Sequence, residues 1–171
     1  MIKKDITYKD FIVSTLASLL FILQIILGFY LLNSISQIEY VAYIGIGLYI
    51  ISGVIFGMLP TVEFRNKGGV NKGKSYIHTT KLVDSGIYSI VRHPQYLSFI
   101  LFAMAGMLLF QHWIIVVLGA SIIPLVYIDL IKADKEGIRK FGDKYKLYMQ
   151  KVPRANLIIG IIRVLKQKLE N

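Results

Sequence analysis

The sequence predicts an all-α, polytopic membrane protein of about four transmembrane helices, and three observations support this fold class. Hydrophobic residues make up 55% of the 171 residues, more than a soluble domain of this length requires. Long apolar runs without any charge alternate with short polar segments. All twenty Lys and Arg residues lie in three of those segments. If each apolar run or hairpin is arranged so that the chain crosses the bilayer back and forth, these three segments lie on the same side.

Two uncharged runs near the N-terminus predict the first two membrane helices. Residues 11–32 would span roughly 33 Å as a helix, enough for a hydrocarbon core. The run is too long for a signal-peptide core and lacks a small-residue cleavage site, which indicates a retained anchor. Residues 40–59 form the second run, which we expect Pro60 to close. Gly53 and Gly57 permit close helix contact, although ordinary glycine use in a membrane helix explains them equally well.

A long polar segment and a helical hairpin follow. Residues 62–92 are polar, basic and glycine-bearing, and this connection is long enough to indicate a function of its own. Residues 96–110 and 113–130 are apolar runs separated only by Gln111 and His112. This spacing predicts a tight hairpin of two membrane helices.

The C-terminal part is charged and amphipathic. Large apolar and aromatic side chains recur there at helical spacing, with Lys and Arg on the other faces. These side chains are Ile138, Phe141, Tyr145 and Tyr148. We therefore expect amphipathic helices at the cytoplasmic face. Residues 157–165 are apolar but too short to cross a bilayer, so they should lie in the interface or pack on the bundle.

The distribution of Lys and Arg predicts the orientation. Three lie before the first run, six between Arg65 and Arg92, and eleven from Lys132 to Lys168. None lies in the link between the first two runs or in the hairpin turn. Both termini and the 62–92 loop should therefore be cytoplasmic, with residues 1–171 forming a single domain in the cell membrane.

Several function classes are disfavoured by composition. The net charge of +10 comes without a nucleic-acid-binding motif, so lipid headgroups are the expected anionic neighbours. Cysteine is absent, and three scattered His residues lack metal-ligand spacing, so we predict no metal site. Residues 68–75, GGVNKGKS, match a phosphate-loop pattern but lack the preceding strand and following helix that such a loop requires. We expect a flexible basic loop here, in which His78 would help to cover a pocket.

Polar residues at membrane-helix ends are the best candidates for a site. Pro94 should open the third span and place Arg92 and His93 at its cytoplasmic mouth, where free amides and the helix dipole attract a carboxylate. The alternative is that both residues anchor the helix end to lipid headgroups. Asp129, near a helix end, is either functional or simply paired with a Lys or Arg or with headgroup water.

Several segments in this order carry a resemblance to a known family: Lys67-Gly68-Gly69, residues 82–88 (LVDSGIY), residues 92–96 (RHPQY), residues 141–145 (FGDKY), Tyr148 and residues 152–154 (VPR). They are similar to the isoprenylcysteine carboxyl methyltransferases and their prokaryotic relatives, which are related to phospholipid N-methyltransferases. The resemblance covers about residues 64–154.

This resemblance implies a pocket for S-adenosylmethionine at the cytoplasmic membrane edge and a hydrophobic or lipid-linked acceptor that enters from the bilayer. It implies cofactor-binding roles for Tyr88, His93, Tyr96, Leu97, Asp134, Tyr145 and Tyr148. It implies catalytic roles for Arg92, Glu136 and Arg154. No nucleic acid or metal partner is implied, and the oligomeric state stays open.

One position departs from the family pattern. The paired glutamates that family members often carry before the Phe-Gly correspond here to Ala133 and Asp134. Glu136 follows two residues later and is a candidate substitute. The alternative is that both carboxylates are solvated charges that open an amphipathic helix.

The chemistry separates two acceptors. Methyl transfer from a sulfonium is an in-line displacement, so the protein mainly positions the reactants and excludes water. A carboxylate acceptor is already ionised and needs an orienting cation, such as Arg92 or Arg154. A phospholipid amine must lose a proton, so it needs a base such as Glu136 or Asp134. A membrane reductase of related architecture and a non-catalytic lipid-binding or scaffold protein are further alternatives.

Overall fold

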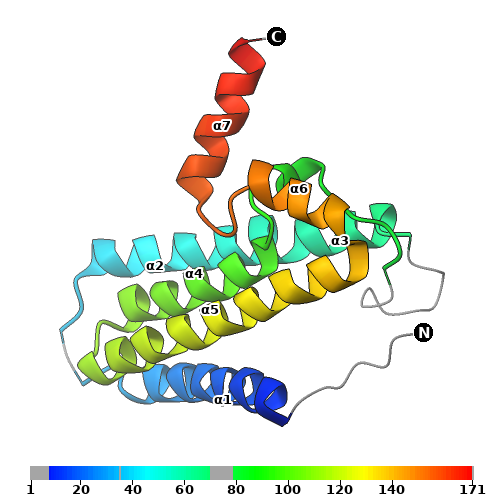
Figure 1. The fold of residues 1–171 in the computed structure, drawn as a ribbon. Helices are drawn as coiled ribbons and strands as arrows, with labels where there is room; N and C mark the ends of the chain where they lie inside the picture. The colour runs from blue at the N-terminus through cyan, green and yellow to red at the C-terminus, as the bar shows by residue number, and fades with distance from the viewer. Residues whose placement is uncertain (1–7, 35, 70–78, 171) are drawn as a thin grey trace. The chain divides into compact units, whose positions relative to one another are not determined.

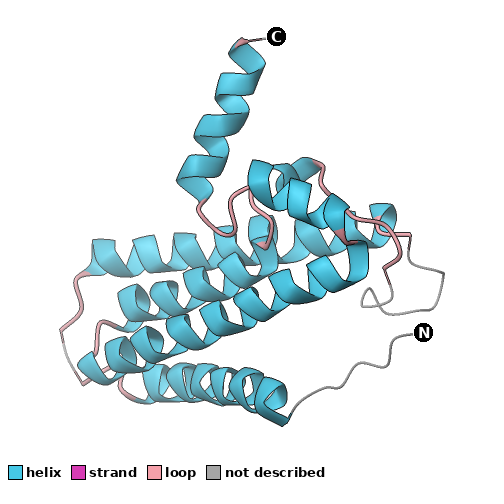
Figure 2. Cartoon of the chain, viewed as in Figure 1, coloured by secondary structure: helices cyan, strands magenta, loops and turns pink. Residues whose placement is uncertain are grey.

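The computed structural model describes residues 8–34, 36–69 and 79–170, and within these ranges the regular structure is entirely helical (Figures 1 and 2). Residues 70–75 of the phosphate-loop pattern, His78 and the N-terminal Lys3 and Lys4 lie outside the described residues. The elements in order are α1 (Tyr8–Tyr30), α2 (Glu39–Ile51), the π-helical η1 (Ser52–Met58), α3 (Leu59–Lys67), the 3₁₀ turn η3 (Gly86–Ser89), α4 (Pro94–Phe110), α5 (Trp113–Phe141), α6 (Asp143–Lys151) and α7 (Leu157–Leu169).

Three continuous helices are long and apolar enough to cross a membrane: Phe11–Tyr30, Glu39–Lys67 and Trp113–Phe141. The shorter apolar helix α4 has 17 residues, which corresponds to about 26 Å and suits a hairpin arm. This confirms the predicted all-α class with three to four membrane helices.

The second span is longer than the sequence indicated. We expected Pro60 to end it, but α2, η1 and α3 form one helix that runs to Lys67. Proline lacks an N–H donor, so one backbone hydrogen bond of the helix is missing at Pro60. The π-helical segment before it changes the local hydrogen-bond pattern and allows the helix to continue. Hydroxyl groups also satisfy carbonyls of this segment: Ser98 donates to Ser52 O and Thr61 donates to Gly57 O. The polar loop therefore begins after Lys67.

The described chain divides into two compact units. The first comprises residues 1–51 and 99–132. In this unit Gln24 is buried, and its Nε2 donates to Ala103 O (3.1 Å) and Ile115 O (3.4 Å). A polar side chain inside an apolar bundle is costly unless it is hydrogen-bonded, so Gln24 joins α1 to both arms of the hairpin.

Asp129 belongs to the same unit and is paired. Its carboxylate accepts from Ser14 Oγ (2.7 Å) and lies 3.2 Å from Lys132 Nζ. The simpler of the two interpretations of Asp129 therefore agrees with the structure.

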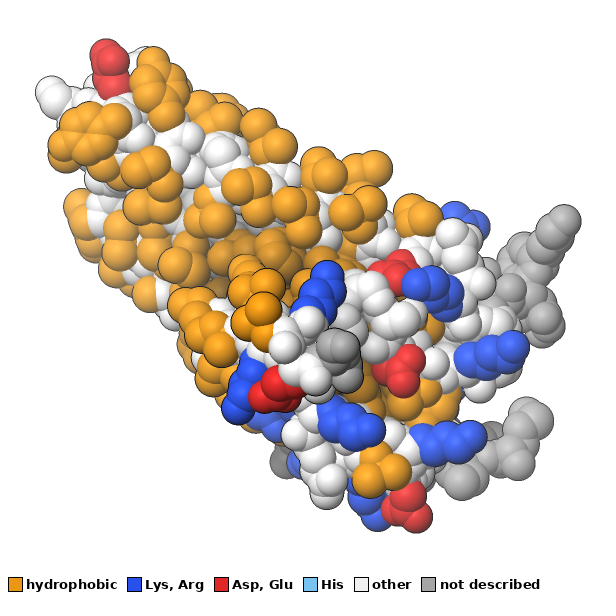
Figure 3. Space-filling view, turned by 90° about the horizontal axis from the view of Figure 1, so that it is seen from above, with side chains coloured by type: hydrophobic (Ala, Val, Ile, Leu, Met, Phe, Trp, Pro, Cys, Tyr) orange, Lys and Arg blue, Asp and Glu red, His pale blue; other side chains and the backbone are white. Residues whose placement is uncertain are grey.

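The surface of the helices is largely apolar. Large hydrophobic side chains are exposed along α1, α2 and α5, among them Phe11, Leu19, Phe29, Tyr40 and Trp113. Figure 3 shows hydrophobic side chains covering a broad continuous surface on the face in view. A soluble domain rarely exposes such an area, whereas lipid contact explains it.

The hairpin turn is as short as predicted. Only Gln111 and His112 separate α4 from α5. Gln111 has a φ of 50°, a conformation that non-glycine residues seldom adopt. Two hydrogen bonds of the Gln111 side chain offset the cost of this backbone conformation. Its Oε1 accepts from Ile38 N and its Nε2 donates to Ile38 O, both at 3.0 Å.

The second unit comprises residues 52–98 and 133–171. Its small core consists of Tyr145, Tyr148 and Val152, with Leu82, Ile138, Phe141 and Met149 packed against it. The predicted amphipathic segment is divided here, because α5 continues to Phe141 and α6 begins at Asp143. Gly142 makes the break, with φ 59° and ψ −132°.

We expect Gly142→Ala to lower the free energy of unfolding by about 1 to 3 kcal/mol, because an L side chain seldom adopts this backbone conformation. A Cβ at Gly142 would meet nothing within 4 Å, so the cost comes from the backbone alone. Thermal unfolding in detergent measures it. Gly47→Ala is the matched control, since its Cβ also meets open space but its φ is ordinary. An equal loss of stability in both variants would contradict the explanation.

Candidate functional site

The carboxylate of Asp134 is the centre of a polar cluster in the second unit. Its side chain is only 4% exposed. Oδ1 accepts from His93 Nε2 (2.7 Å) and from the hydroxyl of Tyr145 (3.0 Å). Oδ2 accepts from Arg154 Nε (2.7 Å) and lies 3.5 Å from Arg92 Nη2. Four side chains from three segments of the chain therefore converge on one carboxylate.

Backbone hydrogen bonds hold two of these segments side by side. Arg92 N donates to Pro153 O (3.0 Å), and His93 N donates to Arg154 O (3.1 Å). Pro94 begins α4 directly afterwards, as its fixed φ and missing donor favour. Both arginines and the histidine are thus positioned by main-chain contacts and by the start of a helix.

Tyr145 is held in place by a close fit to α5. A Cβ at Gly137 would lie 2.3 Å from the Tyr145 ring, so only glycine allows this approach. Tyr145 also packs edge to face on Tyr148 (5.7 Å between ring centroids), whose hydroxyl donates to Tyr88 O (2.6 Å). Burial, with the nearby charge of Asp134, raises the pKa of Tyr145 above its usual value. The phenol therefore stays protonated and remains a donor.

The cluster carries a net positive charge. Arg92 and Arg154 face the single carboxylate of Asp134, and two arginines outweigh one aspartate. The Arg92 side chain is only 6% exposed. Although its Nε and Nη1 are buried, they have no hydrogen-bond partner among the described residues. Buried guanidinium donors without a partner are costly. An anionic group beside this guanidinium would provide an acceptor for these donors.

Asp134 is poorly suited to act as a base. A carboxylate that accepts from a histidine, a tyrosine and an arginine, with a second arginine beside it, is stabilised in its ionised form. Because an ionised carboxylate only accepts hydrogen bonds, His93 Nε2 carries the proton of that contact. Asp134 therefore orients the cations and His93.

The structure brings together five of the residues predicted from the sequence: Arg92, His93, Asp134, Tyr145 and Arg154. The other cofactor-binding candidates lie around them. Tyr96 packs edge to face on His93 (5.7 Å), and the buried Leu97 donates its N–H to His93 O. Tyr88 and Tyr148 form the hydrogen-bonded pair beside Tyr145.

Glu136 lies apart from this group. Its side chain is 49% exposed and pairs with Arg139 Nη2 at 2.6 Å. Among the described contacts, none joins Glu136 to Asp134 or to the two site arginines.

Two supporting residues escaped the sequence analysis. Glu63 accepts from Ile87 N (3.2 Å) and pairs with Lys67, and a Cβ at Gly86 would collide with its carboxylate. Glu63 thus fixes the turn η3 that precedes Arg92. The signal in the sequence was its spacing of four residues from Lys67. The second supporting residue is Gly137. A glycine inside a charged helical segment is unusual, and this was the signal in the sequence that could have identified it.

Fold and site together define a helical membrane protein with a buried, positively charged cluster built around one aspartate. Comparison with known proteins extends this description. The model of the isoprenylcysteine carboxyl methyltransferase (ICMT) family matches residues 72–139. This range contains Arg92, His93 and Asp134, and it confirms the resemblance drawn from the sequence motifs.

Two curated relatives agree with the family match. The protein-S-isoprenylcysteine O-methyltransferase of Schizosaccharomyces pombe is 29% identical over 98 residues, which cover 52% of this chain and 42% of the relative. The protein-S-isoprenylcysteine O-methyltransferase B of Arabidopsis thaliana is 22% identical over 147 residues, covering 81% of this chain and 70% of the relative. The chain thus spans less than half the length of the first relative. None of the solved structures compared matches it.

Proposed function

We propose that this protein transfers a methyl group from S-adenosylmethionine to the carboxylate of a hydrophobic, membrane-resident acceptor of the isoprenylcysteine type. The single observation that carries the proposal is the buried Arg92, whose Nε and Nη1 have no partner in the part of the chain that the structure describes. The family match and the names of both relatives, which are carboxyl or O-methyltransferases, support this chemistry.

The residues fit S-adenosylmethionine. This cofactor supplies an electrophilic methyl group on a sulfonium and also carries a carboxylate. Arg92 would hold that carboxylate, because a guanidinium with unpaired N–H donors forms charge-assisted hydrogen bonds to a carboxylate. The rings of Tyr96 and Tyr145 both contact His93, the chain neighbour of Arg92, and these three rings would line the cofactor site.

The chain's own contribution to the reaction is positioning. Asp134 holds both arginines and His93, so these groups need no reorganisation when the reactants bind. Arg154, whose side chain is 32% exposed, is the more accessible cation and would orient the acceptor carboxylate. Holding the reactants in line at contact distance accounts for much of the rate enhancement in such displacements.

A phospholipid amine is the second candidate acceptor, and it requires a general base. The carboxylate in the described cluster, Asp134, is already engaged by four donor groups. The alternative base, Glu136, is paired with Arg139 and half exposed. Both observations favour a carboxylate acceptor, which has no proton to lose.

We further propose that the site faces the cytoplasm, with both termini on that side. The basic segments support this orientation, since all Lys and Arg lie in the N-terminal segment, in residues 65–92 and after residue 131. S-adenosylmethionine would enter from the cytoplasm and the acceptor from the bilayer.

Methyl transfer to a farnesylated cysteine with a free carboxylate should proceed at a rate that is nearly constant from about pH 6 to 9. An α-carboxyl group titrates near 3.5, so it is ionised throughout this range. Tyr145 keeps its proton over the same range because its folded-state pKa is raised, and this contribution would be lost only as pH rises through that value.

Labelled S-adenosylmethionine and the purified protein in detergent provide the assay, with phosphatidylethanolamine as the competing acceptor. A rate that rises about tenfold per pH unit, with transfer to the amine lipid, would assign the amine instead. Transfer to neither acceptor, by protein that does not bind the cofactor, would refute the methyltransferase proposal and favour a lipid-binding protein.

A further inference from the structure

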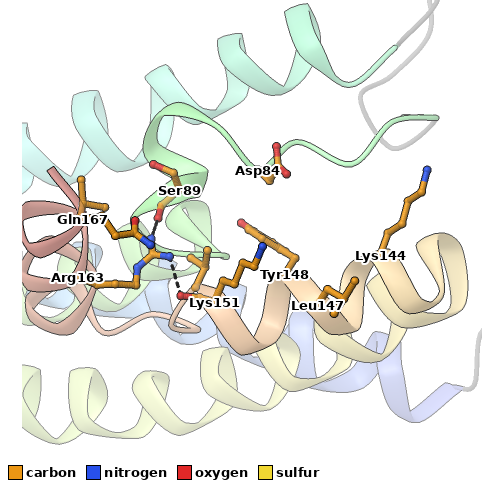
Figure 4. A pocket seen from close by; sticks show the side chains of 10 residues that line it. Asp84, Ser89, Lys144, Leu147, Tyr148, Lys151, Arg163 and Gln167 are labelled. Atoms are coloured by element: carbon orange, nitrogen blue, oxygen red, sulfur yellow. Dashed lines mark hydrogen bonds between the residues drawn. The ribbon is translucent and has the colours of Figure 1, made fainter. Parts of the chain in front are cut away.

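A pocket in the same unit lies between α6, α7 and the segment that leads into η3 (Figure 4). It has a volume of about 340 Å³ and is lined by Asp84 and Ser89, by Lys144, Tyr148 and Lys151 of α6, and by Arg163 of α7. Asp134, His93 and Arg92 do not line it. Tyr148 stands between the two regions, since it lines the pocket and its ring packs on Tyr145.

The charges in this pocket favour an anion. Three cations, Lys144, Lys151 and Arg163, face one carboxylate. Lys144 and Lys151 are two helical turns apart on α6, so they project from the same side of that helix. Both side chains are exposed, and neither forms an ion pair with any described residue. They are available to bind a ligand.

Arg163 is fixed at the edge of the pocket. Its Nη1 donates to Lys151 O (2.7 Å) and its Nη2 to Ser89 O, so it joins α7 to α6 and to η3, as the dashed lines in Figure 4 show. Its Nε is buried and has no hydrogen-bond partner among the described residues. The arginine therefore places its positive charge at the edge of a pocket that already contains two exposed lysines.

Helix α7 has the character of an interfacial helix. The exposed side chains on it include Ile158, Ile159, Ile161, Ile162 and Leu165, and Arg163 and Lys168 flank this apolar stripe. Its start is packed closely on the unit, because a Cβ at Gly160 would lie 2.2 Å from Ile90 O. An exposed apolar stripe bordered by basic residues is typical of a helix that lies at the headgroup level of a bilayer.

We propose that this pocket binds the phosphate of an anionic phospholipid headgroup, with the apolar side of α7 embedded beside it in the acyl boundary. Lysine and arginine donors match phosphate oxygens, and the net charge of the pocket attracts an anionic lipid. The apolar stripe next to the pocket distinguishes a lipid from free phosphate, since it provides a surface for the acyl chains. The inference does not depend on the methyl-transfer proposal.

The test is calorimetric titration of the purified full chain, in an uncharged detergent, with dihexanoyl-phosphatidylglycerol below its critical micelle concentration. A basic residue near an anionic lipid contributes about fivefold to affinity, so Lys144→Gln with Lys151→Gln should weaken binding by about 30-fold. Binding should also fall as sodium chloride is raised.

The matched control removes two cations outside both the pocket and α7, Lys146→Gln with Arg139→Gln. Each of these residues already has an acidic partner, and we expect at most a twofold effect. An equal loss in both double variants would show unspecific charge attraction and overturn the proposal. Inorganic phosphate binding as tightly as the lipid would assign the pocket to free phosphate, and equal binding of dihexanoyl-phosphatidylcholine would refute selection of anionic lipids.

The melting temperature of each double variant and its affinity for S-adenosylmethionine complete the experiment. All four substituted residues are exposed, so both quantities should match those of the unmodified protein. If the pocket variant loses lipid binding while it keeps its fold, the pocket is the lipid site whatever the outcome for the cofactor.

Discussion

Replacing Asp134 by Asn should abolish methyl transfer and destabilise the second unit by about 3 to 5 kcal/mol, because removing one partner of a buried ion pair leaves the other uncompensated. Asp134 is the counter-charge in contact with Arg92, and the side chains of this pair are 4% and 6% exposed. The Asn side chain has the same shape but no charge, and its NH₂ group would face a donor from Tyr145 or Arg154.

Glu136→Gln is the matched control for this substitution. It removes a carboxylate two residues further along the same helix. We expect its free energy of unfolding to lie within about 0.5 kcal/mol of that of the unmodified protein, and its rate of methyl transfer to be unchanged. Thermal unfolding and the initial rate of methyl transfer measure both variants. If Glu136→Gln stops transfer while Asp134→Asn leaves it intact, the roles assigned to the two carboxylates are reversed.

The second large effect is expected for Arg92→Lys, which should weaken binding of S-adenosylmethionine more than 100-fold while the protein stays folded. Lysine keeps the charge beside Asp134 but lacks the guanidinium Nε and Nη1, the two buried donors that have no partner within the described chain. Two hydrogen bonds to a charged group are worth about 3 kcal/mol or more, which corresponds to this loss of affinity.

Calorimetry with S-adenosylmethionine and with its demethylated product provides the measurement. Arg139→Lys makes the same chemical change on an exposed arginine that pairs only with Glu136 among the described contacts, and it should bind as the unmodified protein does. Unchanged cofactor affinity in Arg92→Lys, with a normal melting temperature, would show that these donors serve another ligand. The acceptor carboxylate would then be the first alternative.

Ala133, where family members often carry a glutamate, affects the charge balance of the cluster. One carboxylate, that of Asp134, already receives a histidine, a tyrosine and an arginine, with a second arginine 3.5 Å away. With alanine at position 133, that position provides no second carboxylate to balance the other arginine. The surplus positive charge that remains is the feature that prepares the cluster for an anionic ligand.

The sequence by itself determined the class of the fold. Uncharged runs long enough for a bilayer, with every Lys and Arg outside them, predicted the helices that the structure contains. The two-residue link at Gln111 and His112 predicted the hairpin, because so short a connection leaves antiparallel neighbours as the only solution. The motif around Arg92, His93 and Pro94 located one edge of the candidate site, since proline marks a helix start.

Only the tertiary structure decided which carboxylate contacts the two arginines and where the second membrane helix ends. Asp134 and Glu136 are two residues apart, which places them about 200° apart around a helix, and the sequence alone does not say which direction faces Arg154. Pro60 is a local signal for a helix end, but the π-helical turn and the Ser98 and Thr61 hydroxyls let the helix continue. Local rules fail at these positions because distant residues supply the missing hydrogen bonds and counter-charges, and folding alone brings those residues into contact.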